Sequence, residues 1–103
     1  MNFLQQGDVL IKKIEKLPKN KNEVKRKKNG YILADGEVTG HAHRIDDDID
    51  LFENNNVLYM KNDHEVTLTH EEHGDVQIPD GIWQIGIVQE YDHFAEVARQ
   101  IAD

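Results

Sequence analysis

Residues 57–69 read VLYMKNDHEVTLT, and this stretch decides the fold class. Two runs rich in Val, Leu, Tyr and Thr, 57–61 and 65–69, flank the tripeptide Asn-Asp-His at 62–64. Val, Tyr and Thr favour strands, and Asn and Asp tolerate the left-handed backbone of tight turns. Apolar and polar side chains alternate in the second run, as they do along a strand with one buried face. The stretch therefore predicts a β-hairpin.

Short apolar runs between turn signals continue on both sides of this stretch. Asparagine, glycine and proline mark turns at 54–56, 74–75 and 79–81, and Pro18 ends the first run. The predicted strands are 8–17, 31–35, 40–45, 57–61, 65–69, 76–78 and 82–91. Strands this short, with no helix between them, predict an all-β fold, either a small barrel or a sandwich.

The last part of the chain has a different period. Residues 94–101 (FAEVARQI) have apolar side chains at 94, 97, 98 and 101, which predicts a short C-terminal helix. A length of 103 residues suits one domain. No repeat or linker divides the chain, so we expect a single domain over 1–103, with 19–29 as a basic loop.

Two residue types are absent and exclude whole classes of chemistry. The chain contains neither cysteine nor serine, which rules out disulfides, iron–sulfur clusters, cysteine-based zinc sites, and thiol or serine nucleophiles. Any metal must be held by His, Asp, Glu or backbone oxygens. No apolar run approaches the ~20 residues of a transmembrane helix, and the first residues do not resemble a signal peptide. We expect a cytoplasmic protein with no membrane contact.

Charge is unevenly distributed along the chain. Residues 1–34 carry nine Lys/Arg and three Asp/Glu, a net of +6, whereas 35–103 carry three and 17, a net of −14. Residues 19–28 hold six of the cations and one acid. The acidic body makes nucleic acid an improbable partner, because it repels phosphate. Segment 19–28 is either a solvated hairpin tip or the contact through which the chain forms a homo-oligomer.

The histidines carry the clearest chemical signal. His41 and His43 are two residues apart on a predicted strand, so their rings should face the same side. His70 and His73 enclose Glu71 and Glu72, and a tight turn there would let both rings and one carboxylate converge. This HEEH sequence lacks the i, i+4 spacing of the zinc-protease motif.

Together the two pairs predict a metal site formed by His41, His43, His70 and His73. Such nitrogen and oxygen donors suit a divalent transition metal, zinc in first place, with iron, nickel, manganese or copper as alternatives. The alternative is that these are exposed or hydrogen-bonded structural histidines. We expect His64 and His93 to lie on the surface, and Asp46, Asp47, Asp48 and Asp50 to form a solvated acidic loop.

Two classes of function follow. The first is a metal-binding β-domain, extending to a hydrolase or oxygenase of unknown substrate in which Glu72, Glu71 or Glu37 is the general base. The second is a non-enzymatic interaction or oligomerisation protein that uses the basic loop 19–28.

Two resemblances support the first class. The HxH at 41–43 and the later Pro79-Asp80-Gly81 turn resemble the cupin plan, in which a small β-barrel holds a metal through HxH and a later histidine. The cupin glutamate has no clean counterpart here, and no histidine follows Gly81 at the cupin spacing. Over nearly its whole length the chain is also similar to short bacterial and phage proteins with the segments GEVTGHAHRI and LTHEEHGDVQIPDGIWQI, a group without an assigned activity. That resemblance implies one folded unit and the same four histidines.

Overall fold

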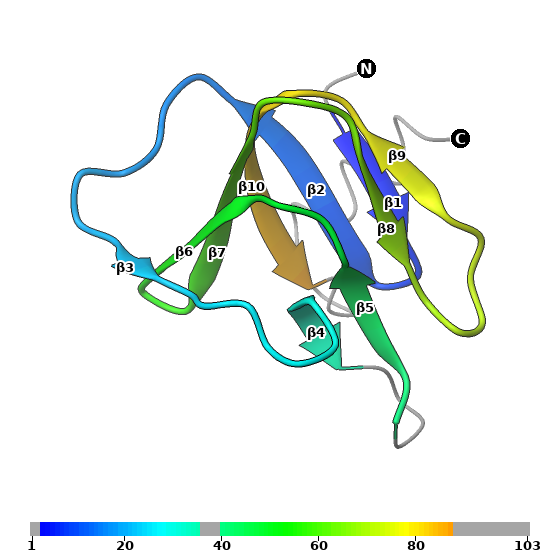
Figure 1. The fold of residues 1–103 in the computed structure, drawn as a ribbon. Helices are drawn as coiled ribbons and strands as arrows, with labels where there is room; N and C mark the ends of the chain where they lie inside the picture. The colour runs from blue at the N-terminus through cyan, green and yellow to red at the C-terminus, as the bar shows by residue number, and fades with distance from the viewer. Residues whose placement is uncertain (1–2, 36–39, 88–103) are drawn as a thin grey trace.

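The computed structural model describes residues 3–35 and 40–87, and the strands in this part of the chain form two antiparallel sheets (Figure 1). The strands are β1 (Phe3–Gln6), β2 (Val9–Ile14), β3 (Asn22–Glu23), β4 (Tyr31–Asp35), β5 (Ala42–Ile45), β6 (Asp50–Asn54), β7 (Val57–Asn62), β8 (Val66–Thr69), β9 (Val76–Ile78) and β10 (Gly81–Ile87).

The larger sheet has six strands in the order β1-β2-β10-β7-β6-β3. Its two tightest hairpins follow from residues that accept positive φ. Gly7, at φ 57°, opens the two-residue turn between β1 and β2. Asn55 and Asn56, at φ 51° and 65°, form the turn between β6 and β7, as the type I′ geometry of two-residue hairpins requires. The turn predicted at 54–56 is therefore confirmed.

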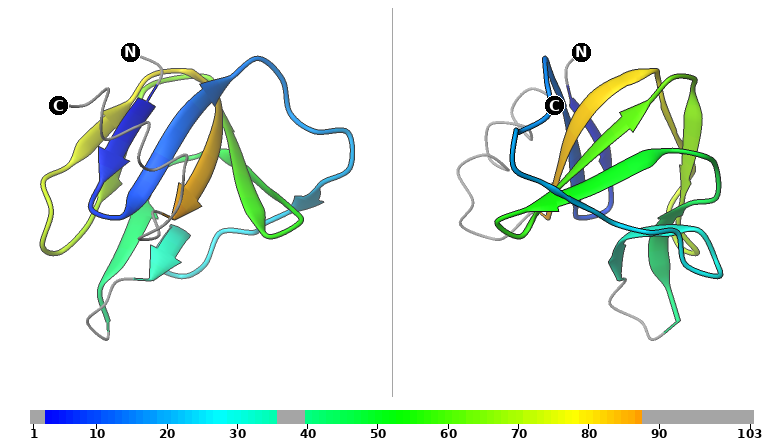
Figure 2. Two further views of the ribbon diagram at one scale, coloured as in Figure 1. Left: turned by 180° about the vertical axis from the view of Figure 1, so that it is seen from behind. Right: turned by 60° about the vertical axis from the view of Figure 1, so that its left-hand side comes forward.

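The smaller sheet has four strands in the order β4-β5-β8-β9 and packs against the larger one. The two sheets do not close into a barrel, so the fold is sandwich-like (Figure 2). Alternation along the strands directs one face of each sheet inward. The buried apolar side chains between them are Val9, Ile11, Leu33, Ile45, Ile49, Leu51, Met60, Val66, Leu68, Ile78, Trp83 and Ile85.

The hairpin predicted across residues 57–69 is wrong, although both of its strands exist. β7 pairs with β6 and β10, whereas β8 pairs with β5 and β9 in the other sheet. The reason is Asn62, whose buried side chain donates hydrogen bonds to the carbonyls of His64, Ile78 and Pro79. Its Oδ1 accepts one from Trp83 Nε1. These bonds stabilise a crossing from one sheet to the other.

Other boundaries also differ from the sequence prediction. β2 ends at Ile14, which is its last residue paired with β10, so residues 15–17 do not continue the strand. β1, β3 and β6 were not predicted as strands. The part of the predicted strand 82–91 beyond residue 87 and the predicted helix 94–101 lie outside the described residues. Within 3–35 and 40–87, no helix is long and apolar enough to span a membrane.

Candidate functional site

A group of histidines lies where three segments of the fold meet: the β1–β2 turn, the start of β5, and the connection 70–75 between β8 and β9 (Figure 1). We call His41, His43, His70 and His73 the imidazole cluster. Each segment brings its residues from a different part of the sequence, and the pairing of β8 with both β5 and β9 places the connection 70–75 beside β5.

His43 is the buried member of the imidazole cluster, with 1% of its surface exposed. Its Nδ1 lies 2.9 Å from Oε1 of Gln6, which is itself 2% exposed. The amide nitrogen of Gln6 donates to the carbonyls of Leu68 and Gly74, each at 2.9 Å. Gln6 thus ties β1, β5 and the 70–75 connection together.

These contacts determine which nitrogen of His43 carries the proton. Because both partners of the Gln6 amide nitrogen are carbonyls, that position must be the NH₂ group, and the other must be the oxygen. The oxygen can only accept, so Nδ1 of His43 must donate. In the neutral ring, Nε2 then has a free lone pair. This orientation of a histidine by a hydrogen bond at its other nitrogen is typical of metal ligands.

The lone pair of His43 Nε2 faces a carboxylate. Asp8, in the β1–β2 turn, places Oδ1 3.4 Å from Nε2. The pKa of His43 is lowered, first by burial and then by the neighbouring His70, while Asp8 acts in the opposite direction. A lowered pKa favours the neutral ring.

His70 lies at the centre of the imidazole cluster. Its ring centroid is 4.3 Å from that of His43, 4.7 Å from that of His73 and 5.8 Å from that of His41. The rings of His43 and His73 are 5.9 Å apart and nearly parallel. The structure therefore brings together all four histidines that the sequence singled out.

One hydrogen bond restricts how His70 acts. The backbone N–H of Glu72 donates to His70 Nδ1 at 3.0 Å. If Nδ1 coordinated a metal ion, the metal would take the place of the Glu72 N–H at this nitrogen. If Nε2 coordinated a metal ion, its proton would move to Nδ1, and Nδ1 could no longer accept the hydrogen bond from Glu72. Either way, a metal on His70 must break the bond from Glu72.

Glu71 approaches the imidazole cluster from the 70–75 connection. A ligand atom from each of His41, His70 and Glu71 lies within 4.8 Å of the other two. Both Glu71 oxygens also accept hydrogen bonds at 2.8 Å, Oε1 from the Ala42 N–H and Oε2 from Arg44. The pKa of Glu71 is lowered, chiefly by the Ala42 bond and less by Arg44 and His41, so the carboxylate is ionised.

His41 supplies an unpartnered atom. Within 3–35 and 40–87, its Nδ1 is the one buried side-chain nitrogen or oxygen without a hydrogen bond. Oε2 of Glu72 lies 3.8 Å from this nitrogen, too far for a hydrogen bond. Buried polar atoms are normally satisfied, and a cation bound to this nitrogen would satisfy it.

Gly7 makes room for His73. A Cβ at position 7 would lie 2.6 Å from Nε2 of His73, closer than atoms in contact allow. The glycine, which the turn also needs for its positive φ, therefore lets the imidazole lie against the β1–β2 turn next to Asp8.

The remaining predicted residues have different outcomes. Glu72 is 59% exposed at the edge of the imidazole cluster, while Glu37 and His93 lie outside the described residues. His64 is exposed, as predicted, and hydrogen-bonds with carboxylates of Asp63 and Asp47. Sequence reasoning missed Gln6 and Asp8. The Gln-Gly-Asp sequence at 6–8 predicts a turn. It does not predict that this turn packs against His43.

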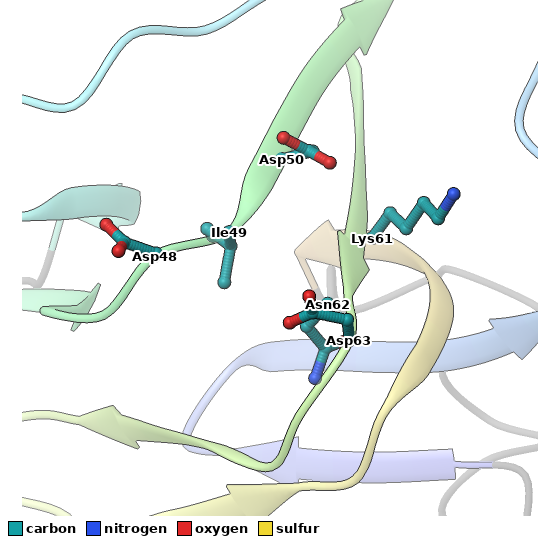
Figure 3. A pocket seen from close by; sticks show the side chains of 6 residues that line it. All are labelled: Asp48, Ile49, Asp50, Lys61, Asn62 and Asp63. Atoms are coloured by element: carbon teal, nitrogen blue, oxygen red, sulfur yellow. The ribbon is translucent and has the colours of Figure 1, made fainter.

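A hollow of about 320 Å³ lies elsewhere, at the end of β7, and is lined by acidic side chains (Figure 3). The side chain of Lys61 points away from Asp48, and the side chain of Asn62 is already hydrogen-bonded at both ends. Its lining residues are Asp48, Ile49, Asp50, Lys61, Asn62 and Asp63. No buried unpartnered polar atom lines this hollow among the residues described, so the imidazole cluster is the better candidate site.

The basic segment 19–28 is part of the connection between β2 and β4 and includes β3, which pairs with β6 at the edge of the larger sheet (Figure 1). Its cationic side chains are exposed. Arg26 forms an ion pair with Asp46 in the same chain, and Lys21 lies over the ring of Phe52.

Comparison with known proteins gives one result. The family model described as "Domain of unknown function (DUF8820)" matches residues 5–88. That range includes Gln6, Asp8 and the whole imidazole cluster. Neither the curated proteins nor the solved structures gave a significant match.

Proposed function

Since this chain belongs to the DUF8820 family, whose function is unknown, we propose a function from its geometry: it binds a divalent transition metal ion, zinc in first place, at the imidazole cluster. The observation that carries the proposal is the orientation of His43. Gln6 holds the proton on Nδ1, so Nε2 keeps its lone pair, and an oxygen of Asp8 lies 3.4 Å from it.

The distance between these two atoms matches a metal site. Two ligand atoms about 2.05 Å from a zinc ion, at the tetrahedral angle, are about 3.3 Å apart. The observed separation of His43 Nε2 and Asp8 Oδ1 is 3.4 Å. A direct hydrogen bond from a charged imidazole to a carboxylate would be shorter, about 2.7–2.9 Å. The spacing of this pair therefore allows a cation to bind both atoms.

Further donors lie next to this pair. His70 and His73 come from the exposed connection 70–75, and their rings are 4.3 and 5.9 Å from that of His43. Three protein donors and a water molecule form the usual set of a catalytic zinc ion. A metal-dependent hydrolase or oxygenase is the extension of this proposal. Glu72 suits a general base better than Glu71, because both oxygens of Glu71 already accept hydrogen bonds.

The test is calorimetric titration of zinc into the full chain after chelation and dialysis. We expect stoichiometric binding, lost or strongly weakened in the double variant His70→Ala/His73→Ala. These residues lie in the connection 70–75 rather than in a strand, so the variant should fold. His64→Ala, an exposed histidine outside the cluster, is the matched control. Binding that is absent, or equal in all three proteins, overturns the proposal.

A second readout follows from His70. Coordination at either of its nitrogens releases the N–H of Glu72. Zinc should therefore shift the backbone amide resonance of Glu72 and speed its hydrogen exchange. An unchanged amide in zinc-saturated protein means that His70 is not a ligand.

A second candidate function rests on the exposed basic segment 19–28. In this alternative, the segment contacts the acidic body of a second copy, and residues 35–103 supply the net charge of −14 that it would meet. Such contacts weaken with salt, because exposed charges are screened beyond ~10 Å at 0.1 M. Light scattering should then show a dimer at low salt that dissociates at high salt. A monomer under both conditions rejects this alternative.

A further inference from the structure

Leu10, near the start of β2, is buried but lies outside the apolar core. It is 2% exposed, yet it does not belong to the cluster of buried residues between the two sheets. Its chain neighbours Val9 and Ile11 do belong to that cluster. Side chains alternate along a strand, so Leu10 points to the outer face of the larger sheet, away from the smaller one. A buried leucine on this face must be covered by something other than the core.

The two residues paired with Leu10 on this outer face offer it little cover. They are Gln5 in β1 and Gly86 in β10. Gln5 is exposed, and a glycine has no side chain. The connection that follows β2 leads to β3, which lies at the far edge of the same sheet (Figure 1). The cover must therefore come from another part of the chain.

The cover belongs to the same chain, because Leu10 is already 2% exposed in a single copy. Three ranges lie outside the described residues: 1–2, 36–39 and 88–103. The first is two residues long, and the second joins two strands of the smaller sheet. The third begins beside Leu10, because Gly86, which pairs with Leu10, lies two positions before residue 88. Residues 88–103 are therefore the part of the chain best placed to cover Leu10.

We infer that residues 94–101 pack over Leu10 on the outer face of the larger sheet. This inference does not depend on the proposed metal site. The apolar side chains at 94, 97, 98 and 101 share one face of the predicted helix. A helix over 94–101 would be about 12 Å long, and the preceding residues 88–93 can span about 20 Å. Neighbouring strands are about 4.8 Å apart, so this length is sufficient to reach β2 from the end of β10.

The outer face offers an apolar surface that continues beyond Leu10. Ile14 and Ile82 pair across β2 and β10 and point to the same face as Leu10. Both are half-buried, and neither belongs to the core cluster or packs against it. The hydrophobic effect favours burying this surface against the apolar face of 94–101. The outer face would then be an internal packing surface of the chain rather than a site where a partner docks.

The test is NMR spectroscopy of the full chain with labelled Leu, Val and Ile methyl groups. We expect nuclear Overhauser effects between the methyl groups of Leu10 and those of Val97 or Ile101. A mixture of labelled and unlabelled chains separates contacts within one chain from contacts between two chains. Contacts that arise only between chains overturn the inference, and so does a folded protein in which Leu10 has no contact with residues 94–101.

A substitution gives a second readout. Val97→Asp would place a charge against Leu10, so this variant should unfold at a lower urea concentration than the unmodified chain. Its Leu10 methyl contacts should also weaken. Gln100→Asp introduces the same charge at a polar position of the same segment and is the matched control, which should keep the original midpoint. Equal urea midpoints for the three proteins overturn the inference.

Discussion

His43 and His64 show how one residue type acquires opposite roles in two regions of the same small sandwich. His43 is buried beside other imidazoles, and Gln6 fixes its proton on Nδ1, so that Nε2 keeps a free lone pair. His64 is exposed in the crossing from β7 to β8. Each of its ring nitrogens faces a carboxylate, Asp63 at 2.6 Å and Asp47 at 3.2 Å.

The surroundings of these two histidines shift their pKa values in opposite directions. Burial, followed by the neighbouring His70, lowers the pKa of His43. Hydrogen bonds to Asp63 and then Asp47 raise the pKa of His64. Only the neutral ring can donate a lone pair to a metal. Burial and the Gln6 hydrogen bond therefore favour a neutral ring with a free Nε2 at His43, whereas exposed carboxylates favour the protonated ring at His64.

The largest effect should come from His43→Ala. The substitution opens a cavity in the buried end of the sandwich and leaves Oε1 of Gln6 without its donor. We expect the metal-free protein to lose about 2–4 kcal/mol of unfolding free energy. Urea denaturation measures this loss, with His64→Ala as the control that should unfold near the wild-type midpoint. Equal urea midpoints for the two variants would mean that His43 contributes no more to stability than the exposed His64.

Gln6→Leu should have the next largest effect. Leucine fits the buried position but leaves the Leu68 and Gly74 carbonyls and the His43 N–H without this partner. We expect a loss of about 2–3 kcal/mol of stability. Zinc affinity should fall about 10–100-fold, as it does when a residue that orients a metal-bound histidine is removed. Zinc titration of the folded variant measures the second effect, and wild-type affinity would show that Gln6 only stabilises the fold.

Gly7→Ala tests how His73 is placed. The new Cβ would displace the His73 ring. The alanine must also adopt a φ of 57°, which costs an L-residue about 1–2 kcal/mol. Gly40→Ala, at φ 87° with no atom within 4 Å of its Cβ, has the backbone strain without the collision. The ring resonances of His73 should therefore move only in the first variant. Similar shifts of the His73 resonances in both variants would mean that the His73 ring does not contact Gly7.

The smallest effect concerns His64. Its pKa should exceed 6.5 because of Asp63 and then Asp47, and Asp63→Asn should bring it back toward 6.5. A raised folded-state pKa means that protonated His64 stabilises the fold fully below the unfolded value, and that this contribution is lost as pH rises through the folded pKa. Titration of the ring resonances by NMR measures both values. An unchanged pKa in Asp63→Asn contradicts the assigned cause.

Much of the fold follows from local sequence signals. Alternation and turn residues predicted strands at 31–35 and 76–78, and the Asn-rich turn before β7. The failures have non-local causes. Asn62 lies in a sequence that favours a hairpin, but its side-chain hydrogen bonds with Ile78, Pro79 and Trp83 direct the chain into the other sheet. No local pattern contains those partners.

The site shows the same limit. The HxH and HEEH spacings were sufficient to choose the four histidines that the structure brings together. Gln6 and Asp8 lie more than 30 positions earlier in the chain, in a turn whose sequence suits any hairpin. Their proximity to His43 depends on how the two sheets pack, which periodicity does not encode.

The most direct test of the central claim is urea unfolding of the full chain with zinc and with a chelator. An ion that binds only the folded protein stabilises it by mass action, about 2.7 kcal/mol at free zinc 100-fold above the dissociation constant. We predict a midpoint that rises with zinc and returns to the metal-free value with chelator. Identical unfolding curves under both conditions, at a zinc concentration that leaves the protein soluble, would contradict the claim.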